Sequence, residues 1–211
     1  MSEAIQSEPE IKTLNQKKRS FYEENSLFLG RVCLKLGLTP NFITGVSFLI
    51  SIAAGAFFWK GELLWGVFFM LLTAFTDMLD GATARAGNLG TTFGGFLDHV
   101  SDRYGEFFIL AGVTLSGAAH PGWALAALFS MLIASYTRAA AESLCKIDNC
   151  AVGIMGRLEK FLLIMAGATL EHFFPTQRWL EIALIIVAAT SLITAIQRVI
   201  FTKRTLDRRR S

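Results

Sequence analysis

Four aspartates give the sequence its clearest chemical signal, because they occur as two closely spaced pairs. Asp77 and Asp80 are three residues apart, and Asp98 and Asp102 are four residues apart. Side chains at these spacings are neighbours on one helix face, so each pair points its carboxylates in one direction. Oxygen ligands without cysteine or histidine are what hard cations such as Mg²⁺ and Mn²⁺ prefer. The four aspartates therefore predict a site for two metal ions.

This arrangement of acidic residues favours phosphoryl transfer. Two metal ions about 3.5 to 4 Å apart stabilise the attacking and leaving oxygen atoms of such a reaction. Gly81, Gly94 and Gly95 lie beside the aspartates, where a missing side chain lets a phosphate or nucleotide approach the backbone. Packing between membrane helices also uses glycine and explains any one of the three equally well. Their spacing within the aspartate array favours phosphate binding.

The composition indicates a membrane protein. Apolar residues make up 53% of the chain, charged residues 18%, and the mean hydropathy is +0.46, unlike a soluble domain. The apolar residues form six blocks of about 20 residues, the length at which a helix crosses a bilayer core of about 30 Å. The predicted spans are residues 41–59, 63–80, 93–115, 123–144, 152–173 and 179–201. The sequence thus predicts an all-α integral membrane protein with a bundle of six transmembrane helices.

Three segments are expected along the chain. Residues 1–38 form a polar N-terminus and a juxtamembrane amphipathic helix, because apolar and basic residues are mixed there as in helices that lie in the membrane interface. Residues 39–204 form the six-helix domain, and residues 205–211 form a basic C-terminal tail.

Positive charges are unevenly distributed between the two sides of the predicted bundle. They precede the first span, follow the last, and occur in the second and fourth connections, as Arg85, Arg138, Lys146 and Arg157. The positive-inside rule places this side in the cytoplasm, together with both termini and the aspartates. We therefore expect a multi-pass protein of the cell membrane. The net charge of +3 is small and concentrated at the membrane borders, which indicates anionic lipid headgroups rather than nucleic acid as partner.

The residues from Asp77 to Asp102 follow the pattern D-x2-D-G-x2-A-R-x8-G-x3-D-x3-D, with every fixed position present. This pattern resembles the signature of the CDP-alcohol phosphotransferases, or CDP-alcohol phosphatidyltransferases, and the resemblance extends over residues 25–204. It implies a six-helix, dimeric membrane enzyme of phospholipid biosynthesis with an active site that faces the cytoplasm. It also implies a CDP-diacylglycerol or CDP-archaeol donor and the release of CMP.

The same resemblance implies a role for each residue of the signature. Asp77, Asp80 and Asp98 would hold two metal ions, Mg²⁺ or Mn²⁺. Asp102 would complete the second metal site and act as the base toward the acceptor hydroxyl. The residues implied for the CDP part of the donor are Asp80, Gly81, Ala84, Arg85 and Gly94. The deprotonated acceptor would attack the phosphorus nearest the lipid in a single displacement.

Three arginines at predicted cytoplasmic helix ends indicate an acceptor that carries a phosphate. Arginine binds phosphate through two parallel hydrogen bonds, although basic side chains also extend toward lipid headgroups without binding a substrate. Arg138, Arg157 and Arg198 look like the residues that hold the inositol phosphate in phosphatidylinositol-phosphate and archaetidylinositol-phosphate synthases. The resemblance thus implies inositol 1-phosphate as the acceptor. The chain departs from that branch at Ala140, Gly156 and Lys160.

Other functions explain part of these observations. Glycerol 3-phosphate, another phosphorylated alcohol, would use the same basic residues and the same metal chemistry. A divalent-cation transporter would also place carboxylates in the membrane, but it does not explain Arg85, Gly94 and their spacing. A membrane prenyltransferase with paired aspartates needs about nine helices, more than a chain of this length can supply.

Overall fold

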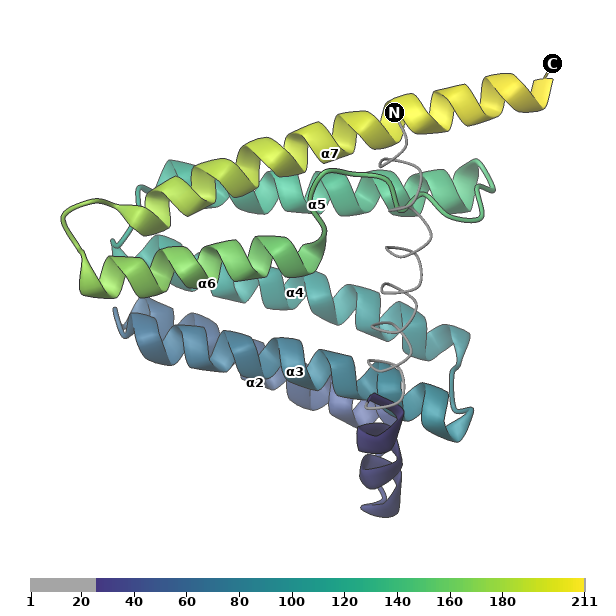
Figure 1. Cartoon of the computed structure of the whole chain (residues 1–211), viewed down its shortest axis with the longest axis horizontal. Helices are drawn as coiled ribbons and strands as arrows, with labels where there is room; N and C mark the ends of the chain where they lie inside the picture. The colour runs from purple at the N-terminus through teal and green to yellow at the C-terminus, as the bar shows by residue number, and fades with distance from the viewer. Residues whose placement is uncertain (1–25, 211) are drawn as a thin grey trace, which may run out of the picture. The chain divides into compact units, whose positions relative to one another are not determined.

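The computed structural model describes residues 26–210, and the regular structure in this range is entirely helical (Figure 1). After a helical segment at residues 26–35, the helices are α2 (Pro40–Trp59), α3 (Leu63–Gly87), α4 (Thr92–Ser116), α5 (Pro121–Leu144), α6 (Arg157–Phe173) and α7 (Trp179–Arg210). The all-α prediction is confirmed for these residues. Most of the segment predicted at residues 1–38 lies outside the described residues, so its amphipathic helix stays a prediction.

Four of the described helices are long and apolar enough to cross a membrane, namely α2, α3, α5 and α7. Helix α4 has 25 residues but carries several charged side chains. Helix α6 has 17 residues, which is about 26 Å at 1.5 Å per residue. The helices indicate a membrane protein, whereas the predicted count of six spans is not confirmed.

The fifth predicted span, residues 152–173, begins too early. Residues 151–156 are not helical, and α6 starts at Arg157. Gly153 has a φ of 153°, a value that only glycine adopts readily and that a right-handed helix does not contain. Arg157 therefore lies in the first turn of α6 rather than inside a longer helix.

Proline is the first residue of two of the described helices. Pro40 is the first residue of α2, and Pro121 is the first residue of α5. A proline in the first turn removes no intrahelical hydrogen bond, so both helices begin where the sequence favours it. At α5 the His120 side chain also accepts a 3.1 Å hydrogen bond from the backbone N–H of Gly122.

The chain divides into two compact units, and α2, α3 and α4 each contribute residues to both. Among the described residues, the first unit consists of residues 26–47 and 74–101, and the second of residues 48–73 and 102–210. In the first unit, residues 26–35 lie directly against α3, because a Cβ on Gly30 would overlap the carbonyl group of Ala82. This unit contains three of the four aspartates.

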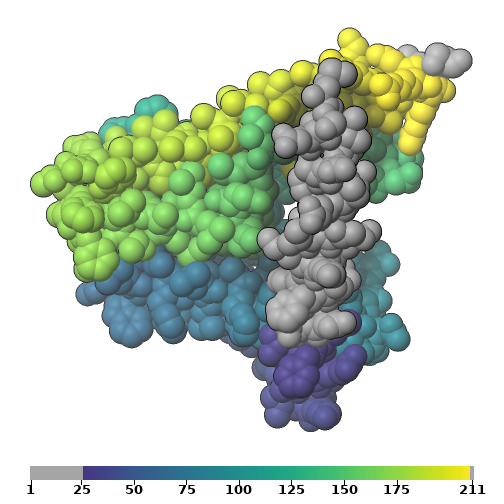
Figure 2. All heavy atoms as spheres, viewed as in Figure 1, coloured from purple at the N-terminus to yellow at the C-terminus, as the bar shows by residue number. Residues whose placement is uncertain are grey.

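The second unit contains a large apolar core. Helix α7 packs against both α5 and α6 (Figure 1), and the atoms of α6 and α7 lie against each other (Figure 2). Fully buried side chains include Phe58, Met70, Ile109, Ile164 and Leu184. Helices α2 and α4 approach closely, because a Cβ on Gly112 would overlap the carbonyl oxygen of Gly55. Such small-residue contacts let membrane helices pack tightly, and they fix the part of α4 that begins with Asp102.

Candidate active site

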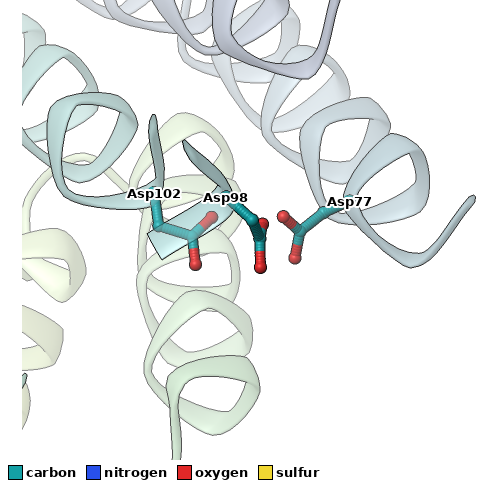
Figure 3. Close-up of side chains that lie close together, drawn as sticks. All are labelled: Asp77, Asp98 and Asp102. Carbon is teal, nitrogen blue, oxygen red and sulfur yellow. The ribbon is translucent and has the colours of Figure 1, made fainter. Parts of the chain in front are cut away.

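The two aspartate pairs lie on separate helices, as their spacing predicts. Asp77 and Asp80 belong to α3, and Asp98 and Asp102 belong to α4. Within the first unit, a carboxylate oxygen of Asp77 lies within 4.8 Å of one of Asp98, and both side chains are half-buried. Their carboxylates point toward each other (Figure 3). Asp77 and Asp98, which lie on different helices, thus bring one face of α3 and one face of α4 together.

Asp102 continues the same face along α4. It follows Asp98 by four residues of the same helix, about one turn, so the two side chains share a helix face (Figure 3). Ionised carboxylates this close repel each other, and a cation between them removes the repulsion. Because the ligand atoms are all oxygens, the arrangement fits the hard divalent cation predicted from the sequence.

Asp80, the fourth predicted metal ligand, lies apart from the carboxylates of Asp77 and Asp98. Among the described residues, it is not in the group of carboxylates in which Asp77 and Asp98 meet. It is 6% exposed, and Thr44 Oγ1 donates a 2.7 Å hydrogen bond to its Oδ2 atom. Its metal ligation therefore stays a prediction, while its contact with α2 is a feature of the fold.

A pocket of about 220 Å³ lies beside Asp80 in the first unit. Residues of the sequence signature form much of its wall, namely Asp80, Gly81, Ala84, Gly94 and Asp98. The start of α2 and the connection between α3 and α4 provide the rest, including Pro40, Asn41, Thr44 and Thr91. Asp98 both lines the pocket and meets Asp77, so a cation held there would adjoin a ligand in the pocket.

Two signature glycines keep this pocket open. A Cβ on Gly94 would lie 3.0 Å from Oδ1 of Asn41 and 3.1 Å from Oγ1 of Thr91. A Cβ on Gly81 would lie 3.2 Å from Nη1 of Arg85. The Arg85 guanidinium therefore lies over Gly81, a residue of the pocket wall, and a guanidinium can donate hydrogen bonds to an anion.

In the second unit, Asp102 and Glu106 hold two arginines. Nη1 of Arg157 lies 2.6 Å from Oδ2 of Asp102, and its Nε lies 3.5 Å from Oε1 of Glu106. Nη1 of Arg103 donates a 2.7 Å hydrogen bond to Oε2 of Glu106, and its Nη2 lies 3.7 Å from Asp102. Arg157, predicted to bind the acceptor, thus contacts the carboxylate predicted to be the base.

The other two predicted acceptor residues are near each other in the same unit. Nε of Arg138 lies 2.9 Å from Oε1 of Glu142. Arg198 donates hydrogen bonds to the carbonyl oxygens of Val152, at 2.9 Å, and Ala134. The charges of Arg138 and Arg198 interact with each other. Two guanidinium groups from α5 and α7 are therefore available in one region, each already oriented by the protein.

Lys160 extends this basic region into α6. This residue, which the sequence analysis interprets as a departure from the inositol-phosphate branch, is only 6% exposed. Its charge interacts with those of Glu106, Arg198 and Arg103. Basic side chains from α4, α6 and α7 thus lie within electrostatic range of one another, which favours the binding of an anion.

Sequence reasoning missed Asn41 and Thr44 in the first unit and Glu106 in the second unit. A signal for Glu106 was present, because it follows Asp102 by four residues and so shares the face of α4 with Asp98 and Asp102. Thr44 lies 36 positions from Asp80 in the sequence. No local pattern connects residues at that separation, and their contact depends on how α2 packs against α3.

Carboxylates that meet beside a pocket of signature residues, in a chain with helices apolar enough to cross a membrane, fit a membrane-embedded and metal-dependent phosphotransferase. The sequence pattern of the CDP-alcohol phosphatidyltransferases matches residues 37–201, which is most of the chain. The protein belongs to the CDP-alcohol phosphatidyltransferase family, as its signature predicted.

Relatives of known function are similar over most of their length. The chain is 38% identical to the archaetidylinositol phosphate synthase of Methanothermobacter thermautotrophicus over 174 residues, which cover 82% of this chain and 88% of the relative. It is 34% identical to the phosphatidylinositol phosphate synthase of Mycolicibacterium smegmatis over 192 residues, which cover 86% of this chain and 85% of the relative. Both relatives make inositol-phosphate lipids, according to their names.

Solved structures of the phosphatidylinositol phosphate synthase of Mycobacterium tuberculosis have the same fold. The complex with manganese and citrate has a TM-score of 0.76 and 28% identity, and covers 84% of this chain and 88% of its own. The complex with CDP-DAG has a TM-score of 0.75 and 28% identity, and covers 84% of this chain and 92% of its own. The similarity therefore extends beyond the sequence signature.

Proposed function

We propose that this protein transfers a phosphatidyl or archaetidyl group from a CDP-linked lipid to inositol 1-phosphate, with release of CMP. The observation that carries the proposal is the position of Asp98, which meets Asp77 and also lines the pocket of signature residues. A metal ion and the diphosphate of a nucleotide would be adjacent there. The names of relatives at 34% and 38% identity favour inositol 1-phosphate over glycerol 3-phosphate as acceptor.

Two divalent cations, Mg²⁺ or Mn²⁺, are part of this proposal. Asp77, Asp98 and Asp102 would hold them, and Asp80 would complete the set from the wall of the pocket. The manganese in the related structure supports a metal of this kind. When bound, the ions would offset the negative charge that develops on the phosphate oxygens.

The donor would place its CDP part in the pocket of the first unit. Gly81 and Gly94 allow the diphosphate to approach the backbone, and Arg85 lies over Gly81 as a hydrogen-bond donor. Asp80 and Ala84 line the same pocket. A related synthase binds CDP-DAG, which supports a CDP-lipid as the ligand, with a diacyl or an archaeal ether tail.

The acceptor phosphate would be held by Arg138, Arg157 and Arg198. Because Arg157 contacts Asp102, a phosphate bound by Arg157 brings its alcohol close to that carboxylate. Asp102 would take the proton of the hydroxyl, and the alcohol oxygen would bond to the phosphorus nearest the lipid. The bond between that phosphorus and the departing CMP oxygen breaks in the same step.

The proposal also includes the orientation of the protein in the cell membrane. The site and both termini would face the cytoplasm, and the protein would form a homodimer, as the family resemblance implies. Basic residues at the end of α7 support this orientation, namely Lys203, Arg204, Arg208 and Arg209. Helix α7 has 32 residues, about 48 Å, so its basic end extends past a bilayer core of about 30 Å.

A CMP-release assay on the purified protein tests the proposal. The protein is given Mg²⁺ or Mn²⁺, CDP-diacylglycerol or its ether analogue, and inositol 1-phosphate, glycerol 3-phosphate, serine or no acceptor. We expect release that depends on inositol 1-phosphate and on metal. It should be lost in Asp102→Asn and retained in Asp148→Asn, which changes an exposed loop aspartate.

Other results of the CMP-release assay would change the proposal in different ways. A preference for glycerol 3-phosphate would replace the acceptor and keep the chemistry. If well-folded protein released no CMP with any acceptor, the enzyme assignment would be wrong. Uptake of divalent cations into vesicles that contain the protein would then favour the transporter.

A further inference from the structure

Glu106 is a buried carboxylate with several cationic neighbours, all in the second unit. The residue is 1% exposed, and a charge at that depth requires partners of opposite sign. Arg103 donates a 2.7 Å hydrogen bond to Oε2, Arg157 lies 3.5 Å from Oε1, and the charge of Lys160 interacts with it. One buried anion therefore orients cationic side chains from α4 and α6.

Glu106 and Asp102 share the same two arginines. Arg157 contacts Asp102 through Nη1 and Glu106 through Nε, and Arg103 also contacts both carboxylates. The guanidinium of Arg157 lies 5.2 Å from the centre of the Phe161 ring, a cation–π contact that holds it from the other side. If Glu106 were neutral, both arginines would lose one ionised partner and keep their contacts with Asp102. Glu106 and Asp102 thus compete for the same two guanidinium groups.

We propose that Glu106 is a positioning residue for the reaction. It holds Arg157 and Arg103 in place, so that the acceptor phosphate meets a preset guanidinium and Asp102 keeps one orientation. A group that is oriented before the substrate binds lowers the barrier more than one that must reorganise. This inference rests on the proposed function, because it concerns the same acceptor and the same base.

The test compares three variants in the CMP-release assay, with the concentrations of acceptor and CDP-lipid varied separately. Glu106→Gln removes the charge and keeps the shape, and Glu106→Asp keeps the charge. Glu171→Gln is the matched control, because Glu171 is also buried, at 7% exposure. Its carboxylate accepts a 3.2 Å hydrogen bond from the N–H of Leu180, which a glutamine oxygen can also accept.

We expect Glu106→Gln to raise the KM for inositol 1-phosphate about 10- to 100-fold, the usual effect of removing an outer partner of a ligand group. The KM for the CDP-lipid should not change. Glu106→Asp should lie between wild type and Glu106→Gln, and Glu171→Gln should match wild type. An unchanged acceptor KM in Glu106→Gln, or equal increases in both KM values, would overturn the proposal.

A double-mutant cycle shows whether Glu106 acts through Arg157. If it does, Glu106→Gln combined with Arg157→Gln should raise the acceptor KM no more than Arg157→Gln alone. Additive effects would contradict the proposal. If Glu106→Gln does not fold, Glu106→Asp provides the test, because its longer contact with Arg157 should still raise the acceptor KM without affecting the donor.

A thermal-unfolding measurement without donor separates this proposal from the proposed function. Inorganic phosphate should raise the melting temperature of wild type and of Glu171→Gln, but not that of Glu106→Gln. If wild type released no CMP with inositol 1-phosphate, the proposed function would fail, and this loss of phosphate stabilisation would still support the positioning role. Equal stabilisation of Glu106→Gln and wild type by phosphate would overturn the positioning role, whatever the activity of wild type.

Discussion

Thr44 donates a 2.7 Å hydrogen bond to the carboxylate of Asp80, and both residues are buried. The bond joins α2 to α3 within the first unit, at the wall of the pocket. A buried acceptor that loses its donor costs about 1 to 3 kcal/mol. The orientation of Asp80 is therefore set by a side chain that the sequence signature does not contain.

Thr44→Val should weaken donor binding, because valine has the shape of threonine and lacks the hydroxyl. We expect the KM for the CDP-lipid to rise about 5- to 150-fold, which corresponds to about 1 to 3 kcal/mol. The KM for inositol 1-phosphate should stay the same. Initial rates at varied CDP-lipid concentration measure the effect.

Thr169→Val serves as the control for this change. The Thr169 hydroxyl donates to the carbonyl oxygen of Met165 on its own helix, at 2.8 Å. Its loss should leave both KM values as in wild type. An unchanged CDP-lipid KM in Thr44→Val would mean that Asp80 does not depend on this bond.

Gly94→Ala should also impair the donor site, for a steric reason. The added methyl group would lie 3.0 Å from Asn41 and 3.1 Å from Thr91, so both side chains would have to shift within the pocket. We expect a higher CDP-lipid KM with little change in melting temperature. Gly45→Ala is the control, because a Cβ there meets nothing within 4 Å. Equal activity of the two variants would show that the pocket tolerates a methyl group.

Removal of divalent metal should destabilise the protein, because cations relieve the repulsion between neighbouring carboxylates. Manganese at about 100 times its dissociation constant should stabilise the chelator-treated protein by about 2.7 kcal/mol. Asp98→Asn should lose this shift, and without metal its melting temperature should equal or exceed that of wild type, because one like charge is gone. Thermal unfolding with and without Mn²⁺ checks both points. A full shift in Asp98→Asn, as expected for the control Asp148→Asn, would contradict the metal site.

Much of the aspartate arrangement was predictable because it depends on the spacing of residues that are close in the sequence. Side chains three or four residues apart share a helix face wherever the helix forms, so Asp98 and Asp102 could be paired from the sequence. The convergence of Asp77 with Asp98 followed from the cost of isolated carboxylates in a membrane. The all-α class followed from the length of the apolar blocks.

The other features of the site depend on packing between helices, which no local sequence pattern specifies. Thr44 reaches Asp80 across 36 positions, and a threonine in an apolar helix is as well satisfied by its own backbone. The predicted start of the fifth span at residue 152 was wrong. Apolar residues occur in 151–156, which favoured a helix, but these residues are not helical and Gly153 has a positive φ. Glu106 was overlooked although its spacing was regular, because it lies beyond the family signature.

Arg138 provides the sharpest test of the acceptor site, because its side chain is 40% exposed and pairs with Glu142 at 2.9 Å. Arg138→Gln removes a charged hydrogen-bond donor worth about 1.5 to 3 kcal/mol. The KM for inositol 1-phosphate should therefore rise about 10- to 150-fold, with no change for the CDP-lipid. Arg178→Gln is the control, since its 72% exposed side chain pairs with Glu181 at 3.3 Å, outside the proposed site. If both variants left the acceptor KM unchanged, Arg138 would not contribute to acceptor binding, and the proposed acceptor site would consist of Arg157 and Arg198 alone.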